Sequence, residues 1–214
     1  DIVAVESATY FLSKGIFADV GVATVELAMD AEGLDVDALS ARLKGGLKIK
    51  ALYTIPNYQN PTGSTLSDTR KAQLARLAAE YDFYVISDEP YTLLNFTDPK
   101  PPTSMAEHDG GSGKMIALGS WSKLVGPGLR LGWIQAQPQT AAKLVNLGIL
   151  NSGGGANPIV SGMIHYGLES GAVVKNIEML REVLGQRLAT LDRALRKHCP
   201  SASFVTPKGG YFLW

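Results

Sequence analysis

The sequence has 214 residues, of which 45% are hydrophobic and 19% are charged, a composition typical of one globular unit or of one domain with part of another. Lysine plus arginine equals aspartate plus glutamate, at 20 each, so we expect neither a nucleic-acid partner nor a membrane surface. The single cysteine excludes an internal disulfide, and no apolar run approaches the length of a membrane span.

Both ends of the sequence have the pattern of strands. Asp1–Glu6 begins in an apolar segment without a methionine or a targeting segment, and Tyr211–Trp214 ends inside another. We therefore expect an internal piece of a longer cytoplasmic protein, with any localisation signals outside these residues.

A strand, a helix and a second strand are predicted between residues 49 and 87. Ile49–Thr54 has the pattern of a strand, and Ser67 is expected to cap a helix whose apolar face extends to Ala78. Phe83–Ile86 follows as a buried strand. This spacing predicts a right-handed βαβ unit with parallel strands.

The second half of the sequence predicts a change in strand direction. Only about a dozen residues separate strand Met115–Gly119 from strand Leu131–Gln135, too few for a helical crossover, so the pair is expected to be antiparallel. Gly153–Gly155 lacks the lysine of a phosphate loop and is interpreted as a flexible connection. Further helices are predicted at about 138–149, 157–170 and 172–197, and further strands at 202–205 and 211–214.

The predicted fold class is α/β, with a mostly parallel sheet sandwiched by helices. Residues 1–171 are expected to form the larger domain, incomplete at its N-terminus, and residues 172–214 to begin a smaller α+β domain. The scattered histidines have no metal-ligand spacing, so no metal site is predicted.

Polar residues follow three of the predicted strands, where open α/β sheets bind ligands. A lysine amine can form an imine with an aldehyde, serines with an arginine can hold a phosphate, and a carboxylate can pair with a pyridine nitrogen. The pattern therefore points to a phosphorylated pyridine aldehyde. The residues expected to converge at this edge are Asn60, Asp88, Tyr91, Ser120, Ser122, Lys123 and Arg130.

These residues stand in motifs that resemble the class I/II, fold-type-I aminotransferases that use pyridoxal 5'-phosphate. The motifs are Asn-Pro-Thr-Gly at 60–63, Asp88-x-x-Tyr91, and Ser120-x-Ser-Lys123 followed by Pro-Gly-x-Arg130-x-Gly, with Glu6-x-Ala-Thr-Tyr10 upstream. The form Pro-Gly-Leu-Arg-Leu-Gly-Trp at 127–133 is similar to the 2-aminoadipate and kynurenine aminotransferase branch. The resemblance covers nearly the whole sequence.

The resemblance implies a role for each matching residue. Lys123 would hold the cofactor as a Schiff base and carry the proton between the substrate α-carbon and the cofactor, while Asp88 would pair with the pyridine nitrogen. Tyr91 and Asn60 would bind the 3-oxygen of the cofactor, and Tyr10 would stack on its ring. Ser120, Ser122 and Arg130 would bind the phosphate. A cis bond between Asn60 and Pro61 is a further hypothesis.

The implied activity is transfer of an amino group between an amino acid and a 2-oxo acid, by a homodimer. Two alternatives stay open: a cofactor-sensing domain of a MocR-type transcription regulator, and a lyase of the same fold. Ala8 stands where the family commonly has proline, and the glycine-rich helix start and the carboxylate-binding arginine of the family have no match in these residues. Which amino acid is used cannot be predicted from the sequence.

Overall fold

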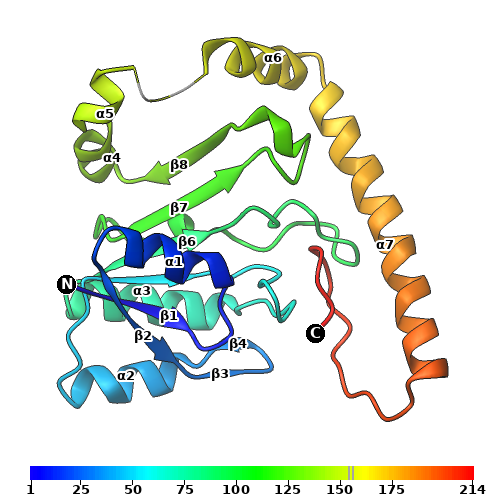
Figure 1. The fold of residues 1–214 in the computed structure, drawn as a ribbon, viewed down its shortest axis with the longest axis horizontal. Coiled ribbons are helices and arrows are strands. Elements are labelled where there is room, and N and C mark those ends of the chain that lie inside the picture. Colours follow the sequence, from blue (N-terminus) through cyan, green and yellow to red (C-terminus); the bar gives the residue numbers. More distant parts are fainter. Residues whose placement is uncertain (154, 156) are drawn as a thin grey trace.

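The computed structural model describes residues 1–153, 155 and 157–214 and has a six-stranded sheet at its centre (Figure 1). The strand order is β2-β1-β5-β6-β7-β8, in which β8 alone runs antiparallel, against β7. The predicted α/β class and the predicted antiparallel pair are thus confirmed. The strands are β1 (Ile2–Glu6), β2 (Ala23–Leu27), β5 (Ala51–Thr54), β6 (Tyr84–Asp88), β7 (Met115–Ser120) and β8 (Gly132–Ala136), with a small hairpin of β3 (Met29–Asp30) and β4 (Gly33–Leu34).

The helices at residues 11–19 and 36–44 were not predicted from the sequence, whereas the predicted helices are present in the described residues except between residues 138 and 151. There the single predicted helix is divided, because α4 ends at Val145 and α5 begins at Gly148, a weak helix former. Gly154, in the connection predicted to be flexible at Gly153–Gly155, lies outside the described residues. The helices are α1 (Phe11–Asp19), α2 (Val36–Lys44), α3 (Asp68–Glu80), α4 (Pro138–Val145), α5 (Gly148–Asn151), α6 (Pro158–Glu169) and α7 (Ala172–His198), with 3-10 turns η1 (Met105–His108) and η2 (Pro127–Leu129). Among the described helices, none combines the length and the apolarity that crossing a membrane requires.

The predicted βαβ unit is formed by β5, α3 and β6. Ser67 caps α3 as expected, because its side-chain oxygen accepts a hydrogen bond from the backbone N–H of Arg70 at 3.3 Å. β5 and β6 are parallel neighbours, with Thr54 paired to Ser87. Their carboxyl ends therefore meet at one edge of the sheet.

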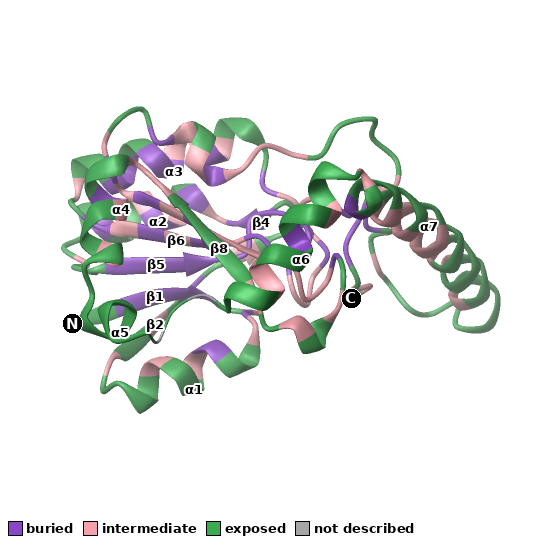
Figure 2. Ribbon diagram, turned by 90° about the horizontal axis from the view of Figure 1, so that it is seen from above, coloured by how far each residue is buried: buried purple, intermediate pink, exposed green. Residues whose placement is uncertain are grey.

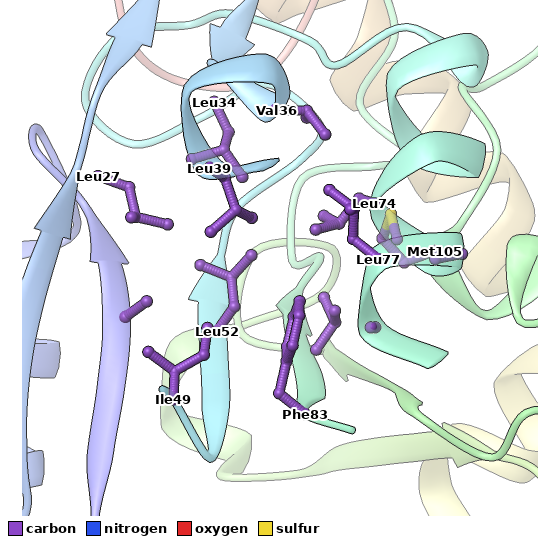
Figure 3. Close-up of a cluster of buried hydrophobic side chains, with 14 of the residues drawn as sticks. Leu27, Leu34, Val36, Leu39, Ile49, Leu52, Leu74, Leu77, Phe83 and Met105 are labelled. Atoms are coloured by element: carbon purple, nitrogen blue, oxygen red, sulfur yellow. The ribbon is translucent and has the colours of Figure 1, made fainter. Parts of the chain in front are cut away.

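Each face of the sheet has its own hydrophobic cluster. On one face, Leu52 and Phe83 pack against α2 and α3, with Leu39 and Leu74 at the centre of the contact (Figure 3). The other face carries Val5 and Tyr53, which pack against side chains from α1 and α7. Figure 2 shows the buried strands between α3 on one side and α1 on the other. Side chains that alternate along each strand supply both clusters.

The predicted strands at 202–205 and 211–214 are wrong. Both segments are irregular, and the single ladder contact nearby is an isolated bridge between Asn95 and Gly209. Phe96 donates its backbone N–H to the carbonyl of Lys208, and Gly210 donates to the carbonyl of Leu94. The apolar pattern near the C-terminus is therefore explained by packing on the loop after β6, with no strand edge beside it in the described residues.

Candidate active site

The carboxyl ends of β5, β6 and β7 lie side by side and carry the predicted site residues. The register pairs Thr54 with Ser87 and Asp88 with Leu118, so the segments that follow these strands start from neighbouring positions. Parallel strands end at the same edge of a sheet, which is the usual ligand-binding edge of such folds. The residues that follow these three strands are therefore close together in space.

Asp88 is the last residue of β6 and lies in a half-buried position. The hydroxyl of Tyr53 donates a hydrogen bond to its Oδ2 at 2.7 Å. Burial raises the pKa of Asp88, whereas the Tyr53 hydrogen bond and the positive charge of Lys123 lower it. The net effect is a raised pKa, and the carboxylate lies within electrostatic range of Lys123.

Tyr91, Asn60 and Tyr10 gather around the same edge. Tyr91 is 4% exposed, and burial raises the pKa of its hydroxyl to about 12, with the negative charge of Asp88 adding to the effect. The Asn60 side chain interacts with the Tyr91 hydroxyl and lowers its pKa, whereas the nearby Tyr10 raises it. The Asn60–Pro61 peptide bond is cis, as hypothesised.

The turn after β7 carries Ser120, Ser122 and Lys123, all half-buried. The backbone N–H of Ser122 donates to Oγ of Ser120 at 3.2 Å, and the hydroxyl of Tyr211 donates to the carbonyl of Lys123 at 2.8 Å. These bonds fix the backbone of the turn, and the positive charge of the Lys123 amine lowers the pKa of Asp88.

Arg130 is near this turn in the hairpin but makes no hydrogen bond to the two serines. It is exposed, lies at a positive φ of 50°, and donates from its guanidinium to the carbonyl of Pro127 at 3.2 Å. Ser120 pairs with Gly132 in the β7–β8 register, so the backbone of Arg130 lies close to the turn. The predicted phosphate-binding set is therefore brought to one region by the backbone and not by side-chain contacts.

Glu6 and Gln59 form a buried connection that the predicted site residues did not include. Glu6, 1% exposed, accepts hydrogen bonds from Thr54 Oγ1 at 2.6 Å and from Gln59 Nε2 at 2.8 Å. The same Gln59 nitrogen donates to the carbonyl of Ala8 at 2.6 Å, and its oxygen accepts from the N–H of Thr62 at 2.7 Å. The loop that carries Tyr10 is thereby tied to the loop that carries Asn60.

Tyr53 and Tyr211 were also missed. A tyrosine in a strand is the ordinary choice of a β-former, so nothing in the sequence marks Tyr53 as a partner of Asp88. Tyr211 lies in a segment predicted as a strand, whereas its ring packs against Tyr91 with centroids 5.6 Å apart and planes at 60°, and its hydroxyl bonds the Lys123 carbonyl. Glu6 carried a usable signal, because a carboxylate that ends a buried apolar strand requires hydrogen-bond partners.

The donor set fits pyridoxal phosphate at the ring end of the ligand. A half-buried carboxylate, with Oδ2 held by Tyr53, leaves Oδ1 for the protonated nitrogen of a pyridine, and the Asn60–Tyr91 pair supplies polar hydrogens beside it. Lys123 provides an amine within the field of Asp88. Among the described residues, no group of histidine, cysteine, aspartate and glutamate side chains could hold a metal ion. A cavity of about 550 Å³ between Thr62–Asp68 and Val205–Lys208 is lined by none of the predicted site residues.

Comparison with known proteins finds aminotransferases and also a transcriptional regulator among the relatives of this chain. A family model described as aminotransferase class I and II matches residues 1–214. The chain is 33% identical to aromatic-amino-acid aminotransferase 1 of Thermococcus litoralis, over all of this chain and 52% of that protein. It is 32% identical to an uncharacterised helix-turn-helix transcriptional regulator of Escherichia coli, over all of this chain and 45% of that protein.

The structural comparison gives the same result. The kynurenine aminotransferase of Pyrococcus horikoshii, solved in complex with PMP, superposes with a TM-score of 0.89 at 32% identity, covering all of this chain and 54% of that one. The chain therefore spans about half the length of the relatives it matches.

Proposed function

Because the chain belongs to the class I and II aminotransferases, we propose that the full-length protein is a pyridoxal-phosphate-dependent aminotransferase acting on an amino acid and a 2-oxo acid. The observation that carries the proposal is that Asp88, held by Tyr53, and Lys123 lie at the ends of adjacent strands, close enough for the charge of Lys123 to lower the pKa of Asp88. The Pyrococcus horikoshii enzyme, with the same fold, was solved with PMP and kynurenine.

Each residue of the site would have a separate task. Lys123 would attach the cofactor through its amine and, once displaced by the substrate amine, accept the proton from the substrate α-carbon. Asp88 would stay ionised and hold a proton on the ring nitrogen, and the Tyr91–Asn60 pair would bind the 3-oxygen. Tyr10 would cover the ring, while Ser120, Ser122 and Arg130 would bind the phosphate. When bound, the cofactor supplies an electron sink for the charge left on the α-carbon.

The attachment point can be tested directly in the full-length protein. After incubation with pyridoxal phosphate, borohydride reduction should fix the cofactor to the peptide that contains Lys123. Mass spectrometry should find no such adduct in Lys123→Ala and an unchanged adduct in Lys143→Ala, a control in α4. An adduct on other lysines only would refute the assignment.

The reaction type requires a second assay. Amino transfer to a 2-oxo acid, without release of ammonia or a thiol, distinguishes the aminotransferase from a lyase of the same fold. Asp88→Asn should keep the Lys123 adduct and lose nearly all turnover, because its neutral amide cannot hold the ring proton. Normal turnover in Asp88→Asn would contradict the role of Asp88.

A second candidate function is supported by the Escherichia coli regulator, which matches all of this chain at 32% identity. In that case the full-length protein would bind pyridoxal phosphate and DNA without sustained amino transfer. DNA binding by gel shift, together with a Lys123 adduct and no turnover, would favour this function over the first.

We further propose that residues 172–214 begin a smaller domain and that the full-length protein is a homodimer. The 27-residue helix α7, which begins at Ala172 after the shorter helix α6, supports the first point. Phe11 and Ile16 on α1 are 76% and 60% exposed, which supports burial of this helix against further protein. We expect light scattering of the full-length protein to give a molar mass twice that of the monomer.

A further inference from the structure

We propose that Tyr53 is a positioning residue of this site, which sets the orientation of the Asp88 carboxylate. The inference rests on the proposed function, because Asp88 has its chemical task only when a cofactor ring is bound. It is carried by the register of the sheet, by the hydrogen bond between the two side chains and by the packing of the tyrosine ring.

The register of the sheet directs Tyr53 towards Asp88. Tyr53 in β5 pairs with Ile86 in β6, and also with Val5 in β1. Asp88 lies two positions after Ile86 on the same strand, so its side chain projects on the same face of the sheet. The length of the tyrosine side chain spans that offset, and its hydroxyl reaches Oδ2 at 2.7 Å.

The ring of Tyr53 has little freedom to move away from this position. It is 5% exposed and belongs to the cluster between the sheet, α1 and α7. The ring of Phe17 in α1 meets it edge-on, with centroids 5.9 Å apart and planes at 73°. Burial first, and then the negative charge of Asp88, raise the pKa of Tyr53, so its hydroxyl stays protonated and acts as the donor.

The consequence for Asp88 is both geometric and electrostatic. A single bond to Oδ2 restricts the rotation of the carboxylate and would leave Oδ1 for a ring nitrogen. The same bond lowers the pKa of a carboxyl group that burial raises. Without the hydroxyl, the carboxylate could rotate and its pKa would rise further. Tyr53 would therefore act on the reaction only through Asp88.

The test is Tyr53→Phe in the full-length protein, which removes one oxygen and keeps the packed ring. Tyr84→Phe is the matched control, because Tyr84 lies on β6 and its ring contacts Lys114 instead of Asp88. Because Tyr53→Phe removes a hydrogen bond to a charged group, we expect the dissociation constant of pyridoxal phosphate to rise about ten-fold. We also expect a lower kcat with a nearly unchanged KM, and no change in either constant for Tyr84→Phe.

A cofactor-free measurement separates this inference from the proposed function. The Asp88 carboxyl carbon, assigned by NMR through Asp88→Asn, should titrate at a higher pH in Tyr53→Phe than in the wild type. If that shift is seen and the wild type binds no pyridoxal phosphate, the proposed function fails while the positioning role stands. If the titration of Asp88 is the same in Tyr53→Phe and the wild type, the inference is overturned.

Discussion

Glu6 is a carboxyl group outside the predicted site whose pKa is strongly raised by its surroundings. It lies at the end of β1 with 1% of its surface exposed, and burial raises its pKa to about 7 against hydrogen bonds from Thr54, Gln59 and Ile55. The nearby charge of Asp88 adds to the rise. A carboxyl group that costs free energy to ionise is therefore kept at the junction of two site loops.

The raised pKa of Glu6 makes the stability of the fold depend on pH. Below its ordinary pKa of 4.5 the group is protonated whether folded or unfolded, and its stabilising contribution is complete. As pH rises through about 7, that contribution is lost, because the folded state must ionise a buried acid. From pH 5 to pH 8 the expected loss in the free energy of unfolding is about 2 to 3 kcal/mol.

Glu6→Gln should remove this pH dependence, since glutamine keeps the shape of the side chain and cannot ionise. Urea unfolding of the full-length variant and wild type at the two pH values measures the difference. Glu178→Gln, on the exposed side of α7, should behave like the wild type. Equal pH dependence in wild type and Glu6→Gln would show that Glu6 is not the titrating group.

Several predicted site residues stood in motifs at strand ends, whereas a role that depends on a neighbouring strand could not be predicted from the sequence. Asp88 and Lys123 were named from their positions after β6 and β7 and lie within electrostatic range. Tyr53 was missed, because its partner Asp88 is 35 residues away and only the register of β5 with β6 brings them together. Phosphate binding by Arg130 stays a prediction, since its contact is with Pro127.

At the scale of elements, the β7–β8 hairpin shows how a small residue shapes the site. Gly119 faces Trp133 across the two strands, and a Cβ added at Gly119 would overlap the Trp133 ring. Trp133 in turn packs on Trp121 of the Lys123 turn, with ring centroids 4.9 Å apart. The absence of a side chain at Gly119 is therefore needed for the aromatic pair beside Lys123.

Gly119→Ala should destabilise the protein by about 1 to 3 kcal/mol, the usual cost of overpacking, and should weaken cofactor binding. Gly128→Ala, in the same connection, has open space around its added Cβ and should change neither property. Urea unfolding and equilibrium dialysis with pyridoxal phosphate measure the two effects. Trp133→Ala combined with Gly119→Ala should cost less than the sum of the single changes, and strict additivity would contradict the overlap.

The elements themselves were predictable where local pattern and spacing agree. The cap at Ser67, the parallel β5–β6 pair and the reversal at β8 followed from capping residues and connection length. The local pattern at 202–205 and 211–214 could not show whether strands form there, because a strand requires a partner strand to pair with. Asn95 and the residues around it provide one isolated bridge instead.

At the scale of the whole molecule, the C-terminal part holds the backbone on which the site is built. α7 donates from Asn176 Nδ2 to the carbonyl of Leu124 at 2.8 Å, and from Arg181 Nε to the carbonyl of Asn95 at 2.8 Å. Tyr211 bonds the carbonyl of Lys123. Figure 1 shows α7 along one side of the molecule and the C-terminal segment returning towards the sheet. Residues 172–214, which we propose to begin a second domain, are therefore bonded to the turn that carries Lys123.

Removing the Asn176 side chain should therefore loosen the turn that carries Lys123. The backbone N–H groups of Leu124, Val125 and Gly126 all donate to the carbonyl of Trp121, so their exchange with solvent reports on opening of this turn. In Asn176→Ala, we expect amide hydrogen exchange at these positions to be about 5-fold faster, the effect of losing one neutral hydrogen bond. Lys175→Ala, exposed on the same helix, should leave it unchanged. Unaltered exchange in Asn176→Ala, measured by mass spectrometry on the full-length protein, would mean that α7 does not stabilise the turn.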